Sequence, residues 1–176
     1  MNNLRKESPP LKLALAGFSG AGKSTVLQRL ARLLPTYQAF DLDQVLVDRF
    51  GPIGTLVEQH GWEHFRQLER QELERIALLD GPWVLALGGG SLGAGAEVLR
   101  ANGVSVIHLD CDFAACWERI KASAATRPLV TGGQERMAEL FTERKKQFDQ
   151  VPLRVAADSS PEEVALAILR LVGLAC

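Results

Sequence analysis

The chain has 176 residues, of which 47% are hydrophobic and 23% charged, and its formal net charge is −1 at pH 7. This composition is typical of an ordinary folded protein, and we expect a single domain over residues 1–176. A charge so close to zero argues against nucleic acid or an anionic membrane as the main partner. No apolar run approaches the length of about 18 residues that a membrane span needs.

The cysteines and the first residues give an expectation about cellular location. Three cysteines, Cys111, Cys116 and Cys176, are odd in number and lack the spacing of a metal site, which favours reduced thiols. The stretch 1–7 lacks the apolar centre of a signal peptide. We therefore expect a cytoplasmic protein, and we expect it to be a monomer.

Residues 17–25 read Gly-Phe-Ser-Gly-Ala-Gly-Lys-Ser-Thr and match the phosphate-binding loop pattern. The mainly apolar stretch 11–16 before it predicts a strand, and apolar residues at helical spacing after it predict a helix that ends at Pro35. In this context the backbone N–H groups and the helix N-terminus bind phosphate. Lys23 would bridge the β- and γ-phosphates, and the Ser24 hydroxyl would be a ligand of Mg²⁺. The sequence therefore predicts a nucleoside triphosphate site formed by Gly20, Ala21, Gly22, Lys23, Ser24 and Thr25.

Strands and helices alternate along the rest of the chain. This alternation predicts an α/β fold with a five-stranded, mostly parallel, doubly wound sheet and helices on both faces. Residues 123–133 are small, polar and glycine-ended, and we expect them to form a mobile lid. The further strands are expected at 38–40, 83–87, 104–109 and 153–156, and the helices at 45–50, 53–59, 62–79, 94–101, 113–122 and 134–150 and from Pro161.

Three segments follow strands of this sheet and should lie together, because ligands gather at the carboxyl ends of parallel strands. They are the loop 17–25, the pair Asp41 and Asp43, and the triple glycine 88–90. Side chains alternate along an extended segment, so Asp41 and Asp43 are expected on one side of such a segment. The three glycines would let a substrate approach the backbone closely.

Two other classes of triphosphate enzyme fit the sequence less well. A regulatory GTPase would carry an Asn-Lys-x-Asp motif to read guanine, and none is present. A mechanical ATPase would have an acidic residue at the end of the strand 83–87 to hold Mg²⁺ through water, but glycine follows there. Asp41, after the second strand, is the best candidate for the carboxylate that supports Mg²⁺.

Five motifs stand in a characteristic order: the loop 17–25, Asp41-x-Asp43, Phe65-Arg66-x-x-Glu69, the glycines 88–90 and Arg127-Pro128-Leu129. With Arg144, which precedes the last expected strand, they resemble the shikimate kinases, a P-loop family of the nucleoside-monophosphate-kinase-like group. The resemblance implies the P-loop kinase fold with ATP and Mg²⁺ as cofactors. It also implies transfer of the ATP γ-phosphoryl group to the 3-hydroxyl of shikimate.

The resemblance assigns roles to individual residues. Arg66 and Arg144 would hold the substrate carboxylate, because the planar guanidinium can bond both of its oxygens. Asp43 would accept from the ring hydroxyls, and Arg127 would swing with the lid over the nucleotide to neutralise developing charge. Catalytic roles fall on Lys23, Asp43 and Arg127, metal ligation on Ser24 and Asp41, and substrate contact on Asp43, Arg66, Arg144, Gly88, Gly89 and Gly90.

Glu69 lies three residues after Arg66 on the expected helix 62–79, close enough to pair with it and fix its rotamer. Without the family pattern, this pair would be interpreted as a weak surface ion pair. With the pattern, residues from about 44 to 79 are interpreted as a helical segment that binds the acceptor.

The chain departs from the family pattern at three places. Trp62 follows Gly61, where the family usually has glutamate, and Lys145 and Lys146 follow Arg144 in place of the usual pattern. The arginine that commonly packs on adenine has only Arg119 or Lys121 as candidates. Two alternatives stay open: a gluconate-type kinase on the same scaffold, and a non-catalytic relative that binds nucleotide to regulate a partner.

Overall fold

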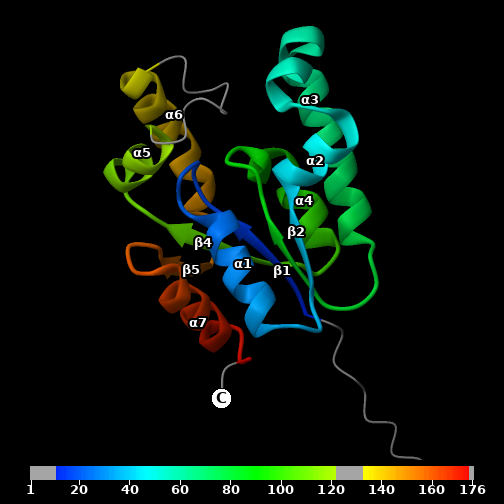
Figure 1. Ribbon diagram of the computed structural model, residues 1–176, viewed down its shortest axis with the longest axis vertical. Helices are drawn as coiled ribbons and strands as arrows, with labels where there is room; N and C mark the ends of the chain where they lie inside the picture. Colours follow the sequence, from blue (N-terminus) through cyan, green and yellow to red (C-terminus); the bar gives the residue numbers. More distant parts are fainter. Residues whose placement is uncertain (1–10, 122–132, 175–176) are drawn as a thin grey trace, which may run out of the picture.

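The computed structural model describes residues 11–121 and 133–174, and these contain a five-stranded sheet in which each neighbouring pair of strands is parallel (Figure 1). The order across the sheet is β2-β3-β1-β4-β5. This confirms the predicted α/β architecture. The strands are Lys12–Ala16 (β1), Gln38–Asp41 (β2), Trp83–Ala86 (β3), Ser105–Asp110 (β4) and Leu153–Ala156 (β5).

Helices cover both faces of this sheet. Helix α1 connects β1 to β2 in one direction across the sheet, and α4 connects β3 to β4 in the opposite direction. Because both crossovers are right-handed, these two helices lie on opposite faces (Figure 1). Helix α7 packs beside α1, and α3 packs against α4. The helices are Lys23–Leu33 (α1), Leu42–Phe50 (α2), Ile53–Ala77 (α3), Ser91–Ala101 (α4), Phe113–Lys121 (α5), Gly133–Phe148 (α6) and Pro161–Leu171 (α7).

The core lies along the three central strands. Strand β3 is buried along its whole length, and β1 is buried from Leu13 onward, because helices cover both of their faces. The edge strand β2 is partly exposed. None of the described helices combines the length and the apolarity that a bilayer span requires.

The parallel strands bring three segments to one edge of the sheet. The phosphate-binding loop follows β1, Asp41 ends β2, and the glycines 88–90 come shortly after β3. Helix α2 and the first half of α3 rise above this edge, and α5 and α6 stand on the other side (Figure 1). The expected meeting of these segments at one edge is therefore confirmed.

Two predicted helix starts were wrong. Helix α2 begins at Leu42 rather than 45, because the Asp41 side chain accepts a hydrogen bond from the Gln44 N–H and caps the helix. Asp43 therefore lies in the first helical turn and not in an extended segment. Helix α4 begins at Ser91 rather than 94. The predicted break between the helices 53–59 and 62–79 is confirmed, because Gly61 has non-helical backbone inside α3, with φ of 79° and ψ of 167°.

Candidate functional site

The phosphate-binding loop closes over the end of β1 and leads into α1. Gly22 caps α1 in the left-handed conformation, with φ of 91°, which favours glycine. Lys23 is buried, and its Nζ donates hydrogen bonds to the carbonyl oxygens of Gly17 and Phe18, both at 2.9 Å. A cavity of about 290 Å³ lies against this loop, and its lining is Ser19, Gly20, Gly22, Lys23, Ser24, Thr25, Asp43, Leu87, Gly89 and Arg119.

The structure separates the two candidates for the adenine contact. The Arg119 guanidinium donates to the carbonyl oxygens of Gly20, at 3.2 Å, and Ala157, at 3.5 Å, so it lies against the phosphate-binding loop. Lys121 forms an ion pair with Glu118 instead. It is Arg119, and not Lys121, that lines the loop cavity.

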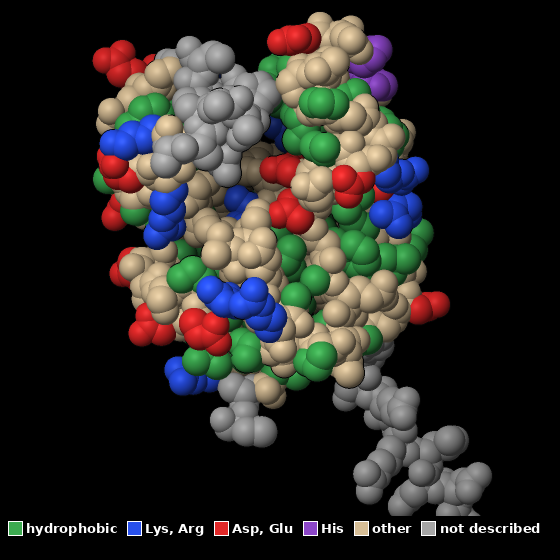
Figure 2. Space-filling view, viewed as in Figure 1, with side chains coloured by type: hydrophobic (Ala, Val, Ile, Leu, Met, Phe, Trp, Pro, Cys, Tyr) green, Lys and Arg blue, Asp and Glu red, His purple; other side chains and the backbone are tan. Residues whose placement is uncertain are grey.

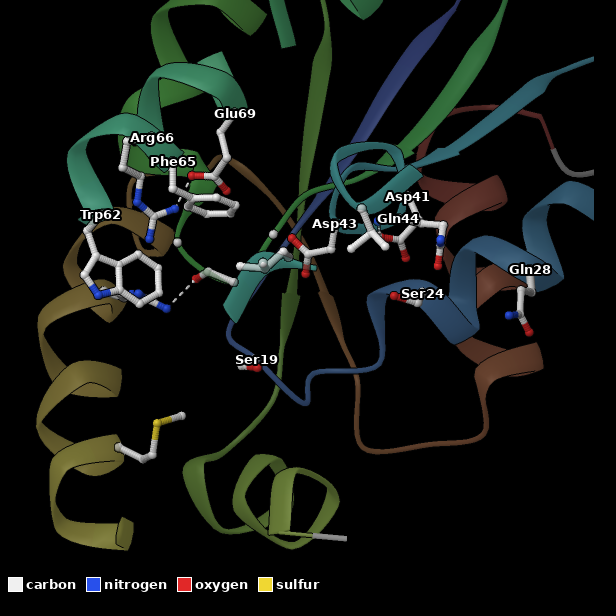
Figure 3. Close-up of a pocket in the computed structure, with 17 residues that line it drawn as sticks. Ser19, Ser24, Gln28, Asp41, Asp43, Gln44, Trp62, Phe65, Arg66 and Glu69 are labelled. Atoms are coloured by element: carbon white, nitrogen blue, oxygen red, sulfur yellow. Dashed lines mark hydrogen bonds and ion pairs between the residues drawn. The ribbon is translucent and has the colours of Figure 1, made fainter. Parts of the chain in front are cut away.

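A larger cavity of about 570 Å³ adjoins the first and has the size of a small-molecule site. Figure 2 shows the molecule hollowed between the α2–α3 side and the α6 side. In Figure 3, Arg66 lies at one end of this cavity and Ser24 and Asp41 at the other, with Asp43 between them. The lining is Ser19, Ser24, Gln28, Asp41, Asp43, Gln44, Val47, Ile53, Trp62, Phe65, Arg66, Glu69, Gly88, Gly89, Gly90, Met137 and Arg144.

The two cavities meet at shared residues. Ser19, Ser24, Asp43 and Gly89 line both of them. The carboxylate of Asp43 also lies against Gly88, since a Cβ built on that glycine would be 2.7 Å from Asp43 Oδ1. The Asp43 carboxylate therefore lies between the phosphate-binding loop and the larger cavity.

Arg66 is held by a buried carboxylate. Its guanidinium pairs with Glu69, which is 1% exposed, as its place three residues along the helix predicts. The second oxygen of Glu69 accepts a hydrogen bond from the buried Ser91 hydroxyl at 2.5 Å. Because Ser91 starts α4 and Glu69 lies on α3, this chain of contacts fixes the direction of Arg66. A weak surface pair would not bury its carboxylate in this way.

Arg144 reaches the same end of the cavity from α6. One guanidinium nitrogen donates to the carbonyl oxygen of Gly89 at 3.0 Å. A Cβ on Gly90 would lie 2.8 Å from a nitrogen of Arg144 and equally close to one of Arg66, so a side chain there would displace both guanidinium groups. Among the described residues, no carboxylate forms an ion pair with Arg144.

The electrostatics of Arg144 reflect this crowding. Burial, and after it the neighbouring positive charge of Arg66, lower the pKa of Arg144 to about 10. The side chain remains charged at pH 7, so this end of the cavity carries positive charge that Glu69 alone does not balance. An anion placed between the two arginines would offset both the burial of the Arg144 charge and its repulsion by Arg66.

Oxygen donors gather at the other end of the cavity. The Ser24 hydroxyl and the Asp41 carboxylate both line it. Mg²⁺ is commonly held by one or two carboxylates together with water and substrate phosphates rather than by a complete protein cage. Ser24 and Asp41 offer oxygen ligands of this kind. No group of three or more His, Cys, Asp or Glu able to hold a metal occurs within residues 11–121 and 133–174.

The sequence did not indicate several residues of this site. Met137 on α6 is 1% exposed and lines the larger cavity together with Gln28 and Gln44. Their sequence signals are those of ordinary helix residues, so only the tertiary arrangement identifies them. Arg127 and residues 123–132 of the expected lid 123–133 lie outside the described residues.

The phosphate-binding loop beside a second cavity with two arginines, on this sheet topology, defines a P-loop kinase of a small acidic acceptor. The family model for shikimate kinase matches residues 19–172. A shikimate kinase of Sulfurihydrogenibium is 35% identical over 88% of this chain and 93% of its own. The chain belongs to the shikimate kinase family, whose members are ATP-dependent kinases.

Solved structures agree with this assignment. The crystal structure of shikimate kinase from Aquifex aeolicus is 31% identical, covers 93% of this chain and 96% of that one, and has a TM-score of 0.77. Shikimate kinase from Acinetobacter baumannii in complex with shikimate has a TM-score of 0.84 at 24% identity, with 94% of each chain covered. The second similarity shows that the fold is shared.

Proposed function

We propose that this chain transfers the γ-phosphoryl group of ATP to the 3-hydroxyl of shikimate and releases ADP and shikimate 3-phosphate. Membership of the family supports the reaction. The observation that carries it in this chain is the convergence of Arg66 and Arg144 over Gly90, at one end of a cavity whose other end meets the phosphate-binding loop.

The acceptor carboxylate would bind between the two guanidinium groups. Arg66 is oriented by Glu69, and Arg144 has a positive charge that no described carboxylate pairs with. A planar guanidinium can bond both oxygens of a carboxylate, so two of them fix the orientation of the acid and of the ring attached to it. The glycines 88–90 have no side chains, so the ring can approach their backbone closely.

The hydroxyl to be phosphorylated would then face Asp43. Because Asp43 lines both cavities, its carboxylate can accept a hydrogen bond from that hydroxyl and hold it toward the terminal phosphate. Phosphoryl transfer passes through a loose transition state that needs little base catalysis. Positioning is therefore the main contribution that we assign to Asp43, and proton acceptance follows as the phosphorus–oxygen bond forms.

The phosphates of ATP would lie on the loop, where Lys23 supplies charge. Nζ of Lys23 is held by the carbonyl groups of Gly17 and Phe18, which places the ammonium group at the loop before nucleotide binds. Mg²⁺, held through Ser24 and Asp41, would supply further neutralisation of the phosphate charge. We assign to Arg127 the same neutralising role from the side of the lid.

We also propose that the enzyme acts in the cytoplasm as a monomer. Cys111 and Cys116 are buried as free thiols, which supports a reducing environment. Sedimentation of the purified protein at micromolar concentration tests the oligomeric state, and we expect the mass of one chain, 19.2 kDa.

The test of the reaction is ADP release from ATP and Mg²⁺ with shikimate, with gluconate or without acceptor. We expect turnover that depends on shikimate. Turnover that depends on gluconate instead would identify an open-chain polyol acid as the acceptor. Tight ATP binding without turnover on either acceptor would identify a non-catalytic nucleotide-binding relative.

A further inference from the structure

Phe18, the second residue of the phosphate-binding loop, lies where that loop meets α6. Its side chain is 2% exposed and lines neither cavity, so we expect neither ligand to touch it. Its carbonyl oxygen accepts hydrogen bonds from the Lys23 ammonium group at 2.9 Å and from the Ala21 N–H at 3.1 Å. The position of the ring is therefore fixed by the same loop that we expect to hold the nucleotide phosphates.

The ring of Phe18 meets α6 at two positions one turn apart. It packs edge-on against Phe141, with centroids 5.1 Å apart and an interplanar angle of 79°. The guanidinium carbon of Arg144, three residues further along α6, lies 5.9 Å from the centroid of the Phe18 ring. This distance falls within the range of cation–π attraction, which is stronger where the cation is withdrawn from water. Arg144 is partly buried, so the ring stabilises its charge.

An aromatic partner suits an arginine that must bind an acid. Arg66 pairs with Glu69, whereas no carboxylate within residues 11–121 and 133–174 forms an ion pair with Arg144. A carboxylate partner would occupy the N–H donors that a bound acid needs. An aromatic ring attracts the cation through its π electrons and leaves those donors open. Phe18 therefore stabilises the charge of Arg144 without competing with the acceptor for it.

We propose that Phe18 is a positioning residue that holds Arg144 in place for the acceptor carboxylate. Because its ring belongs to the phosphate-binding loop, it fixes the position of the bound acid relative to the phosphates of ATP. Phe18 acts only through Arg144 and contacts neither ligand. This inference rests on the proposed function, because it takes the acceptor to be an acid that Arg144 binds.

Steady-state kinetics test the proposal with Phe18→Leu, which keeps a large apolar side chain but removes the ring. Loss of the cation–π contact should raise the KM for shikimate about 3- to 10-fold, with kcat and the KM for ATP within about 2-fold. Phe18→Met should give the same rise, because it also lacks a ring. An unchanged KM for shikimate in both variants, or an equal rise for ATP, would overturn the inference.

The matched control is Phe113→Leu. Phe113 packs against Phe141 with centroids 5.5 Å apart and lines neither cavity, and in the described part of the chain it has no cation–π contact with Arg144. Its replacement removes aromatic packing beside α6 but should leave the KM for shikimate unchanged. A rise as large as that of Phe18→Leu would show that the KM reports the packing of α6 and would refute the role of Phe18.

A double-mutant cycle separates positioning from a general structural effect. Once Arg144 is replaced by methionine, adding Phe18→Leu should change the KM for shikimate by less than about 2-fold, because the contact no longer exists. The dissociation constant of shikimate without nucleotide, measured by titration calorimetry, should follow the same pattern. An equal factor in both backgrounds would refute the role of Phe18, whereas lack of shikimate-dependent turnover in the unaltered enzyme would refute the proposed function itself.

Discussion

The guanidinium groups of Arg66 and Arg144 share the space above Gly90, and among the described residues only Arg66 forms an ion pair with a carboxylate. Arg66 has Glu69 and, behind it, Ser91. Arg144 has the carbonyl group of Gly89, and burial holds its pKa at about 10. Such a group costs stability in the empty protein and gains a partner when an anion binds. Binding sites commonly hold charge in this uncompensated form.

Replacing Arg144 by methionine should separate affinity from stability. We expect Arg144→Met to raise the KM for shikimate about 10- to 100-fold, because the carboxylate loses a charged partner, while the KM for ATP stays within about 2-fold. The melting temperature should hold or rise, since a partly buried charge next to Arg66 is removed.

The control for this variant is Lys145→Ala. Lys145 is the next residue of α6, but it is exposed and pairs with Asp149, so its loss should leave both KM values unchanged. A melting temperature that falls sharply together with unchanged substrate affinity would show that Arg144 serves the fold instead of the acceptor.

At the scale of elements, the site depends on how α2 and α3 are held together, because α2 carries Asp43 and α3 carries Arg66. A buried glutamate joins them. Glu72 on α3 is 2% exposed and pairs with Arg49 of α2 and with Arg75 one turn further along α3. Burial raises the pKa of Glu72, but hydrogen bonds from the two arginines outweigh it, and the pKa lies below its ordinary value.

We expect Glu72→Gln to lower the free energy of unfolding by about 1–2 kcal/mol, since charged hydrogen bonds to half-exposed arginines are lost. A glutamate with a lowered folded pKa contributes stability above its unfolded pKa of about 4.5 and loses it as pH falls through the folded value. The difference between the two proteins in urea unfolding should therefore be full at pH 7 and shrink below pH 4.5. A difference that is constant with pH would contradict the ion-pair account.

Element boundaries show where sequence reasoning succeeds. The apolar runs at 83–87 and 104–109 and the glycine-rich loop predict buried parallel strands and a phosphate site, because each signal is local. Asp43 was misassigned to an extended segment, although Asp41 before a helical pattern is itself a capping signal. The cap moves Asp43 into α2 but leaves both carboxylates on the cavity.

Contacts between distant elements could not be derived in this way. Ser91 meets Glu69 across 22 positions, and Arg144 meets Gly89 across 55. No periodicity or motif in the sequence predicts either contact, because both contacts depend on how α4 and α6 pack against the rest of the fold. Family resemblance identified Arg144 where the residue pattern alone gave no reason to select it.

For the whole molecule, the parallel sheet brings the ends of β1, β2 and β3 to one edge, and the surrounding helices enclose two cavities that meet there. The nucleotide phosphates and the acceptor acid would approach from opposite ends, with Asp43 at the junction. The central claim is therefore one of geometry: a carboxylate on two arginines sets a hydroxyl in line with ATP.

A crystal structure with shikimate and ADP tests this claim most directly. We predict the shikimate carboxylate at hydrogen-bonding distance from both Arg66 and Arg144, and the 3-hydroxyl beside Asp43. Shikimate bound elsewhere on the protein, or bound in this cavity with its carboxylate turned away from both arginines, would contradict the account.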